Sequence, residues 1–104
     1  MKSLVVALLT TLLALTVTAA LAAAPRTGKE VYTAKCAMCH DSGVAGAPKL
    51  GDQAAWKAHL EHGMDHMLEN AKKGIGAMPP MGMCNDCSMA ELKAAVEYLA
   101  GTAK

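Results

Sequence analysis

Residues 36–40 read Cys-Ala-Met-Cys-His, and this pentapeptide constrains the fold more than any other part of the chain. Two thiols three residues apart in one helical turn can both add to the vinyl groups of a single haem, and the adjoining histidine is then held beneath the iron as an axial ligand. A bare Cys-x-x-Cys would also suit a thioredoxin-type redox centre or half of a zinc site. With the histidine included, the motif predicts one haem c, bound covalently through Cys36 and Cys39 with His40 on the iron.

The N-terminal segment has the organisation of an export signal. Lys2 precedes a long apolar run that gives way to alanines, and Ala20-Leu21-Ala22 fits an A-x-A cleavage site. We therefore expect residues 1–22 to be a signal peptide and residues 23–104 to be a monohaem domain. The alternative is an uncleaved anchor, because residues 4–24 are about long enough to span a bilayer. In both cases we expect the domain to lie outside the cytoplasm, in a bacterial periplasm.

The composition of the expected mature domain fits a small cofactor-dependent fold. Lys2 is the only charged residue of the expected signal peptide, so nine basic and nine acidic residues remain, and nothing resembles a basic nucleic-acid-binding surface. The chain has no Phe, and its aromatic residues are Tyr32, Trp56 and Tyr98. A domain of 82 residues with so few large side chains has a small hydrophobic core, and a haem would supply the missing apolar area.

The pattern of caps and apolar positions predicts an all-α fold with about four helices packed around one covalent haem. No alternating pattern typical of β-strands is present. Glycine- and proline-rich loops are expected at 41–51 and 74–83. The expected helices are one opened by the capping box Thr27/Glu30 and running into the haem cysteines, one capped by Asp52 and ending near Gly63, one capped by Asp65 and ending at Gly74, and one opened by the capping box Ser88/Glu91 and ending at Gly101.

A haem iron that only transfers electrons needs a second axial ligand besides His40. Methionines within or beside helices are most often core filling, whereas those in the segment 74–83 can approach a flat cofactor closely. Met78 directly precedes Pro79-Pro80, which restrict the backbone and could stiffen a ligand loop. This reasoning places Met78 first and leaves Met81 open. The six methionines beyond the attachment motif are Met64, Met67, Met78, Met81, Met83 and Met89.

Several stretches together resemble a class I cytochrome c of the cytochrome c₅ type, over essentially the whole mature chain. They are Cys-Ala-Met-Cys-His at 36–40, Gly-Val-Ala-Gly-Ala-Pro-Lys-Leu-Gly-Asp at 43–52, Ala-Met-Pro-Pro at 77–80, Gly-Met-Cys-Asn-Asp-Cys-Ser at 82–88, and Glu-Leu-Lys-Ala-Ala-Val-Glu-Tyr-Leu at 91–99. The combination is much more specific than the pentapeptide alone.

The resemblance implies a role for each of several residues around the haem. It implies that Cys36 and Cys39 bind the haem, that His40 and Met78 ligate the iron, that the Pro48 carbonyl accepts a hydrogen bond from the His40 ring, that Leu50 packs on the haem, that Trp56 lies near its buried edge, and that Tyr98 meets the first helix near Gly28.

Cys84 and Cys87 form a second Cys-x-x-Cys pair. Ser88 follows the second cysteine, so a second haem is disfavoured, and a zinc site is disfavoured because the distant first pair already carries the haem histidine. In an oxidising compartment a local disulfide is the expected state, and the family resemblance agrees. A catalytic dithiol remains an alternative.

His59, His62 and His66 are spaced three and four residues apart, so on one continuous helix they could share a face and bind a metal. Gly63 is expected to break that helix between them. The favoured interpretation is therefore a solvated histidine-rich turn.

We therefore expect an electron carrier and not an enzyme, with redox proteins as partners and no nucleic-acid or small-molecule substrate. These partners would be membrane respiratory complexes or other cytochromes, and the protein would be membrane-bound only if residues 1–22 are retained. One alternative is a haem enzyme or gas sensor whose sixth iron position is open. A second alternative is a thiol-disulfide protein that uses Cys84 and Cys87.

Overall fold

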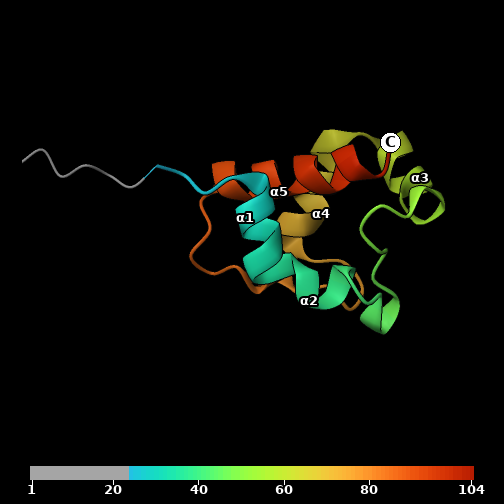
Figure 1. Ribbon diagram of the computed structural model, residues 1–104, viewed down its shortest axis with the longest axis horizontal. Helices are drawn as coiled ribbons and strands as arrows, with labels where there is room; N and C mark the ends of the chain where they lie inside the picture. Colours follow the sequence, from blue (N-terminus) through green and yellow to red (C-terminus); the bar gives the residue numbers. More distant parts are fainter. Residues whose placement is uncertain (1–23) are drawn as a thin grey trace, which may run out of the picture.

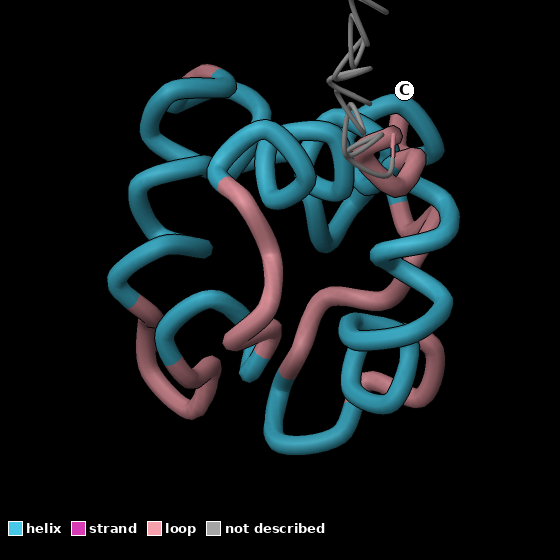
Figure 2. The backbone as a smooth tube through the Cα atoms, turned by 90° about the vertical axis from the view of Figure 1, so that its left-hand side faces the viewer, coloured by secondary structure: helices cyan, strands magenta, loops and turns pink. Residues whose placement is uncertain are grey.

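The computed structural model describes residues 24–104, so the expected signal peptide at 1–22 lies outside the described residues. These residues form helices and loops, with no strand among them (Figures 1 and 2), which confirms the all-α prediction. No helix in this part of the chain combines the length and apolar character needed to cross a bilayer. The elements are α1 (Gly28–Val31), the π-helix η1 (Tyr32–Cys36), α2 (Ala37–His40), the 3₁₀ turn η2 (Val44–Gly46), α3 (Gln53–His62), α4 (Met64–Lys73), the 3₁₀ turn η3 (Pro80–Met83) and α5 (Met89–Thr102).

The first three elements follow one another without a break and form the expected helix that leads into the haem cysteines. The Thr27/Glu30 capping box opens it: the Glu30 amide donates to Thr27 Oγ1 over 3.2 Å, and the Thr27 amide donates to the Glu30 carboxylate over 2.7 Å. The helix widens into a π-turn that ends at Cys36. Such turns are rare and often occur at functional sites.

The third of the expected helices begins two residues earlier than predicted. Gly63, with a φ of 90°, ends α3 and also occupies the N-cap position of α4, whereas Asp65 lies inside the first turn. The prediction that Asp65 caps this helix is therefore wrong, because α4 starts directly after α3 and leaves no separate capping residue. The Asp65 carboxylate still lies near the helix N-terminus, where a negative charge is favourable. The other predicted ends, at Asp52, Gly63 and Gly74, are confirmed.

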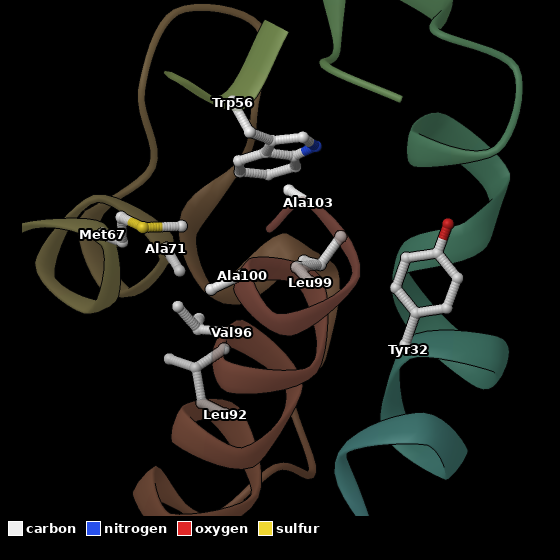
Figure 3. Packing of buried hydrophobic residues seen from close by; sticks show 9 residues of the cluster. All are labelled: Tyr32, Trp56, Met67, Ala71, Leu92, Val96, Leu99, Ala100 and Ala103. Atoms are coloured by element: carbon white, nitrogen blue, oxygen red, sulfur yellow. The ribbon is translucent and has the colours of Figure 1, made fainter. Parts of the chain in front are cut away.

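The last helix opens at the predicted Ser88/Glu91 capping box but continues past Gly101 to Thr102. The predicted stop at Gly101 is wrong by one residue, because packing of the residues around it carries the helix past this weak helix former. Ala100 and Ala103, on either side of Gly101, are both almost fully buried in the core (Figure 3).

Helices α1 and α5 cross in close contact (Figure 1). A β-carbon built on Gly28 would overlap the Ala94 carbonyl group and would lie 3.1 Å from Cβ of Tyr98. One turn along, the Tyr98 ring packs on the Tyr32 ring, with centroids 5.4 Å apart. The absence of a side chain at position 28 thus allows α1 and α5 to lie close together, and the two tyrosine rings pack between them one turn further along.

The main core forms where α5 meets α4, η1 and Trp56 of α3 (Figure 3). Cys36, Leu50 and Met78 are partly buried and pack against this core from three separate segments. We refer to the nine buried residues as the main core. They are Tyr32, Trp56, Met67, Ala71, Leu92, Val96, Leu99, Ala100 and Ala103.

Candidate haem site

Cys36 and Cys39 lie on adjacent helical segments, the first closing η1 and the second within α2, and neither is in a disulfide. Cys36 is partly buried against the main core, while Cys39 is exposed. Burial raises the pKa of the Cys36 thiol, and the nearby Cys39 adds to the effect. A reactive redox thiol has a lowered pKa, so Cys36 does not have the character of a thioredoxin-type nucleophile.

His40 is buried, and its ring orientation is fixed by the loop that follows it. Its Nδ1 lies 2.8 Å from the Pro48 carbonyl oxygen, which can only accept, so Nδ1 carries the proton and donates. The Leu50 amide also donates to the His40 carbonyl over 2.8 Å, which holds the loop against α2. This arrangement leaves the Nε2 lone pair available to a metal, and a hydrogen bond at the other ring nitrogen is the usual support for a metal-bound histidine.

Trp56 connects α3 to the histidine loop. Its indole ring stacks on His40 with centroids 5.6 Å apart and planes at 30°. Its Nε1–H donates to the Lys49 carbonyl over 2.8 Å. Trp56 is buried in the main core (Figure 3), so it links that core to the histidine end of the site.

Met78 lies in a loop whose backbone is tightly held. Two hydrogen bonds join it to Ile75: the Ile75 amide donates to the Met78 carbonyl over 3.1 Å, and the Met78 amide donates back over 2.9 Å. A β-carbon on Gly74 would lie 2.7 Å from the Met78 carbonyl, so only glycine fits there. The Met78 side chain is half-buried against the main core. Met81 packs against the same core, so the structure does not separate the two methionines by position alone.

These residues fit the donor set of a haem c site. Two free thiols lie within one helical turn of a histidine with an available Nε2, and a thioether from a rigid loop packs against the same core as Cys36 and Leu50. Imidazole and thioether are ligands that iron takes in electron-transfer haems.

The second cysteine pair lies apart from this site. Cys84 and Cys87 are joined through their sulfur atoms, with Cα atoms 5.3 Å apart. Cys84 is fully buried against Val31 of α1 and Ala95 of α5, in a cluster separate from the main core. Ser88, next in the chain, caps α5, so no histidine follows this pair. The pair therefore shapes the chain between the Met78 loop and α5.

A polar cluster around the same segment was not predicted from the sequence. The Arg26 backbone amide and Nε both donate to Glu91 Oε2, over 3.0 and 2.7 Å, and its guanidinium lies 3.4 Å from the Asp86 carboxylate. The side-chain hydrogen bond from Arg26, followed by that from the Ser88 backbone, lowers the pKa of Glu91 to about 2. The capping box gave a signal for Glu91, but nothing in the sequence indicated a partner 65 residues away.

A second missed contact lies near the haem cysteines. The Tyr32 hydroxyl donates to the Asp41 carboxylate, linking η1 to the residue after His40. Burial, together with that hydrogen bond, raises the Tyr32 pKa above its ordinary range. Tyrosine and aspartate carry no distinctive spacing here, so sequence alone gives no signal for the pair.

Of the three histidines in α3 and α4, one packs on Trp56 and the other two lie next to each other. His59 packs edge-on against Trp56, with ring centroids 5.7 Å apart. His62 ends α3 and His66 lies in α4, and Gly63 breaks the helix between them as expected. Their rings nevertheless lie next to each other, with centroids 4.9 Å apart.

The chain is similar to known cytochromes. Residues 23–99 match the family model described as cytochrome C oxidase, cbb3-type, subunit III. The chain is 46% identical over 78 residues to cytochrome c5 of Ectopseudomonas mendocina, covering 73% of this chain and 90% of that protein.

Solved structures give the same result. A chain in the crystal structure of an electron transfer complex of nitrite reductase with cytochrome c is 47% identical, with a TM-score of 0.72, covering 74% of this chain and 94% of that one. A mono-heme ferrocytochrome c from Shewanella putrefaciens is 41% identical, with a TM-score of 0.66, and the match covers 75% of this chain and 96% of that one.

The chain belongs to the class I c-type cytochromes. Its similarity to cytochromes c5 confirms the resemblance seen in its motifs. It is an electron-transfer cytochrome that carries one covalently attached haem c.

Proposed function

We propose that residues 23–104 carry one electron at a time between redox proteins of a bacterial periplasm, with His40 and Met78 as the two axial ligands. The bound haem supplies an iron that accepts one electron from a reduced donor and passes it to an oxidised acceptor. The observation that carries the proposal is that both ligand candidates are held by backbone contacts, His40 by Pro48 and Met78 by Ile75.

Rigid ligands suit electron transfer because the site need not rearrange when the charge of the iron changes. A thioether ligand also favours ferrous iron and raises the reduction potential. With both axial positions occupied by side chains, a substrate would find no open position on the iron, and we therefore propose a carrier without enzymatic activity.

We also propose that residues 1–22 are removed on export and that Cys84–Cys87 is a disulfide in the mature protein. The oxidising periplasm and the joined sulfur atoms support the disulfide. A structural relative is the cytochrome of an electron transfer complex with nitrite reductase, and this supports a redox enzyme as one partner class.

The proposal can be tested on protein exported together with its haem-attachment machinery. We expect one haem per chain that survives acid-organic extraction, a low-spin ferric spectrum, and a one-electron redox titration. Mass spectrometry should find Ala23 at the N-terminus. A high-spin ferric protein that binds carbon monoxide readily when reduced would overturn the carrier in favour of a haem enzyme or sensor.

A further inference from the structure

We propose that His62 and His66 form a surface binding site for a divalent transition-metal ion of the Zn²⁺ or Cu²⁺ class, at the junction of α3 and α4. The site is independent of the haem and of the proposed electron carriage.

The spacing of the two rings allows both imidazoles to bind one ion. With a metal–nitrogen distance of about 2.0–2.1 Å and about 1.1 Å from nitrogen to ring centre, a right-angled pair has centroids about 4.5 Å apart and a tetrahedral pair about 5.2 Å. The His62 and His66 centroids are 4.9 Å apart, with planes at 37°. The separation therefore falls between the values for the two common geometries.

The two rings stay next to each other across the helix break at Gly63. His62 is the last residue of α3, and His66 lies in the first turn of α4. Both side chains are exposed, so an ion can reach them while keeping water in its remaining coordination positions.

Asn70 provides a contact that would orient one of the rings. Its side-chain nitrogen Nδ2 lies 3.4 Å from His66 Nδ1. The oxygen and nitrogen of such an amide are assigned from the surrounding network. When the amide is turned over so that its oxygen faces Nδ1, the ring donates Nδ1–H to it and presents Nε2 to the ion, and such a hydrogen bond is the usual second contact of a metal-bound histidine.

The local charge also favours a cation. Residues 61–69 include Glu61, Asp65 and Glu69 but no Lys or Arg. Glu69 is paired with Lys73, while the other two carboxylates have no salt-bridge partner among residues 24–104.

The cysteines and the other histidines of residues 24–104 are engaged elsewhere. Cys36 and Cys39 are consumed by haem attachment, and Cys84 and Cys87 are bonded to each other. His40 is buried and His59 packs on Trp56, so His62 and His66 are the histidines free to converge on an ion.

The test is calorimetric titration of the untagged, haem-loaded protein with Zn²⁺, repeated with Cu²⁺. We expect one ion per chain. Replacing either ligand, in His62→Gln or His66→Gln, should weaken binding at least tenfold, because one remaining imidazole cannot chelate. His59→Gln is the matched control and should bind as the wild type does.

Two further measurements distinguish a specific metal site from non-specific binding to surface histidines. Saturating Zn²⁺ should raise the thermal unfolding midpoint of the wild type, because the ion binds the folded junction, and should not raise that of His66→Gln. Asn70→Ala should weaken binding, whereas Asn70→Asp, which keeps an acceptor, should retain it. Absence of binding, or equal affinity in wild type, His62→Gln and His66→Gln, would overturn the proposal.

Discussion

Gly28 on α1 lies directly against the carbonyl group of Ala94 on α5, and this contact sets how closely the two helices cross. A β-carbon at position 28 would also lie 3.1 Å from Cβ of Tyr98, so it could not be accommodated by moving one flexible side chain. The helix that carries the haem motif is thus positioned by the absence of a side chain.

Gly28→Ala should force α1 away from α5 and lower the free energy of unfolding by about 1–3 kcal/mol, as overpacking of a tight contact does. Gly101→Ala is the matched control, because Gly101 is helical and a β-carbon there meets nothing within 4 Å. It should stabilise the protein by about 0.5–1 kcal/mol, since alanine is the better helix former. Denaturant unfolding of the haem-loaded proteins measures both, and equal effects would contradict the assigned contact.

The helices could be predicted from sequence because their signals are local. The capping boxes at Thr27 and Ser88 and the glycine at position 74 each depend on residues three or four apart, and all three lie where expected. Gly101 failed as a stop signal because burial of Ala103, a tertiary effect, outweighs the weak helix propensity of glycine.

The residues of the candidate site likewise fall into those with a local sequence signal and those without one. The haem attachment residues follow from one local motif, and the contact of His40 with Pro48 from a family resemblance. The ion pair of Arg26 with Glu91 joins segments 65 residues apart and depends on how they pack, which no local spacing encodes. The contact of His62 with His66 has the local i, i+4 spacing, but whether it survives the helix break at Gly63 depends on the angle between α3 and α4.

Acid should weaken the fold through Glu91. Its pKa is about 2 in the folded protein, against about 4.3 for an ordinary glutamate. Because the folded value is the lower one, the stabilisation is present above about pH 4.3 and is lost as the pH falls toward 2. Glu91→Gln keeps a capping side chain but loses the ion pair with Arg26. Its unfolding free energy should therefore fall less steeply than that of the wild type between about pH 5 and about pH 2.

The matched control is Glu97→Gln, an exposed carboxylate on the same helix. Its unfolding free energy, measured by denaturant titration at each pH, should follow the wild-type pH dependence. If Glu91→Gln keeps the full wild-type acid dependence, the Arg26 contact does not hold the charge of Glu91.

The double variant Cys84→Ser/Cys87→Ser should attach haem and keep a low-spin spectrum but unfold more easily. A closed loop this short contributes about 2 kcal/mol by the chain-entropy relation. Loss of Cys84 from its buried position against Val31 adds to the effect. Thermal unfolding measures the change, and loss of covalent haem in this variant would show that the pair has been given the wrong role.

Gly74→Ala should disturb the Met78 loop. Gly74 has a φ of +81°, and a β-carbon there would lie 2.7 Å from the Met78 carbonyl and 2.9 Å from the Pro80 nitrogen. We expect a larger high-spin fraction in the ferric spectrum. Gly76→Ala is the control: it also has a positive φ, of +56°, but its β-carbon meets nothing within 4 Å. It should cost about 1–2 kcal/mol of stability without changing the spin state.

Met78→Ala tests the proposed sixth ligand directly. If Met78 binds the iron, the wild-type ferric protein should show the weak long-wavelength band of sulfur bound to iron, and the variant should lose it. The reduction potential should fall, because the ligand that favours ferrous iron is gone, and the vacated position should admit water or a small ligand. The haem should stay attached, since its thioether bonds are made by Cys36 and Cys39.

Met81→Ala is the matched control, because Met81 belongs to the neighbouring turn η3 and packs against the same main core. It should leave the long-wavelength band and the reduction potential close to the wild-type values. Met81 has a positive φ of 61°, a conformation that costs any residue with a side chain, so alanine there removes a thioether without relieving the backbone. If Met81→Ala abolishes the band while Met78→Ala keeps it, Met81 is the ligand, and the chain is still an electron carrier with a sulfur-ligated iron.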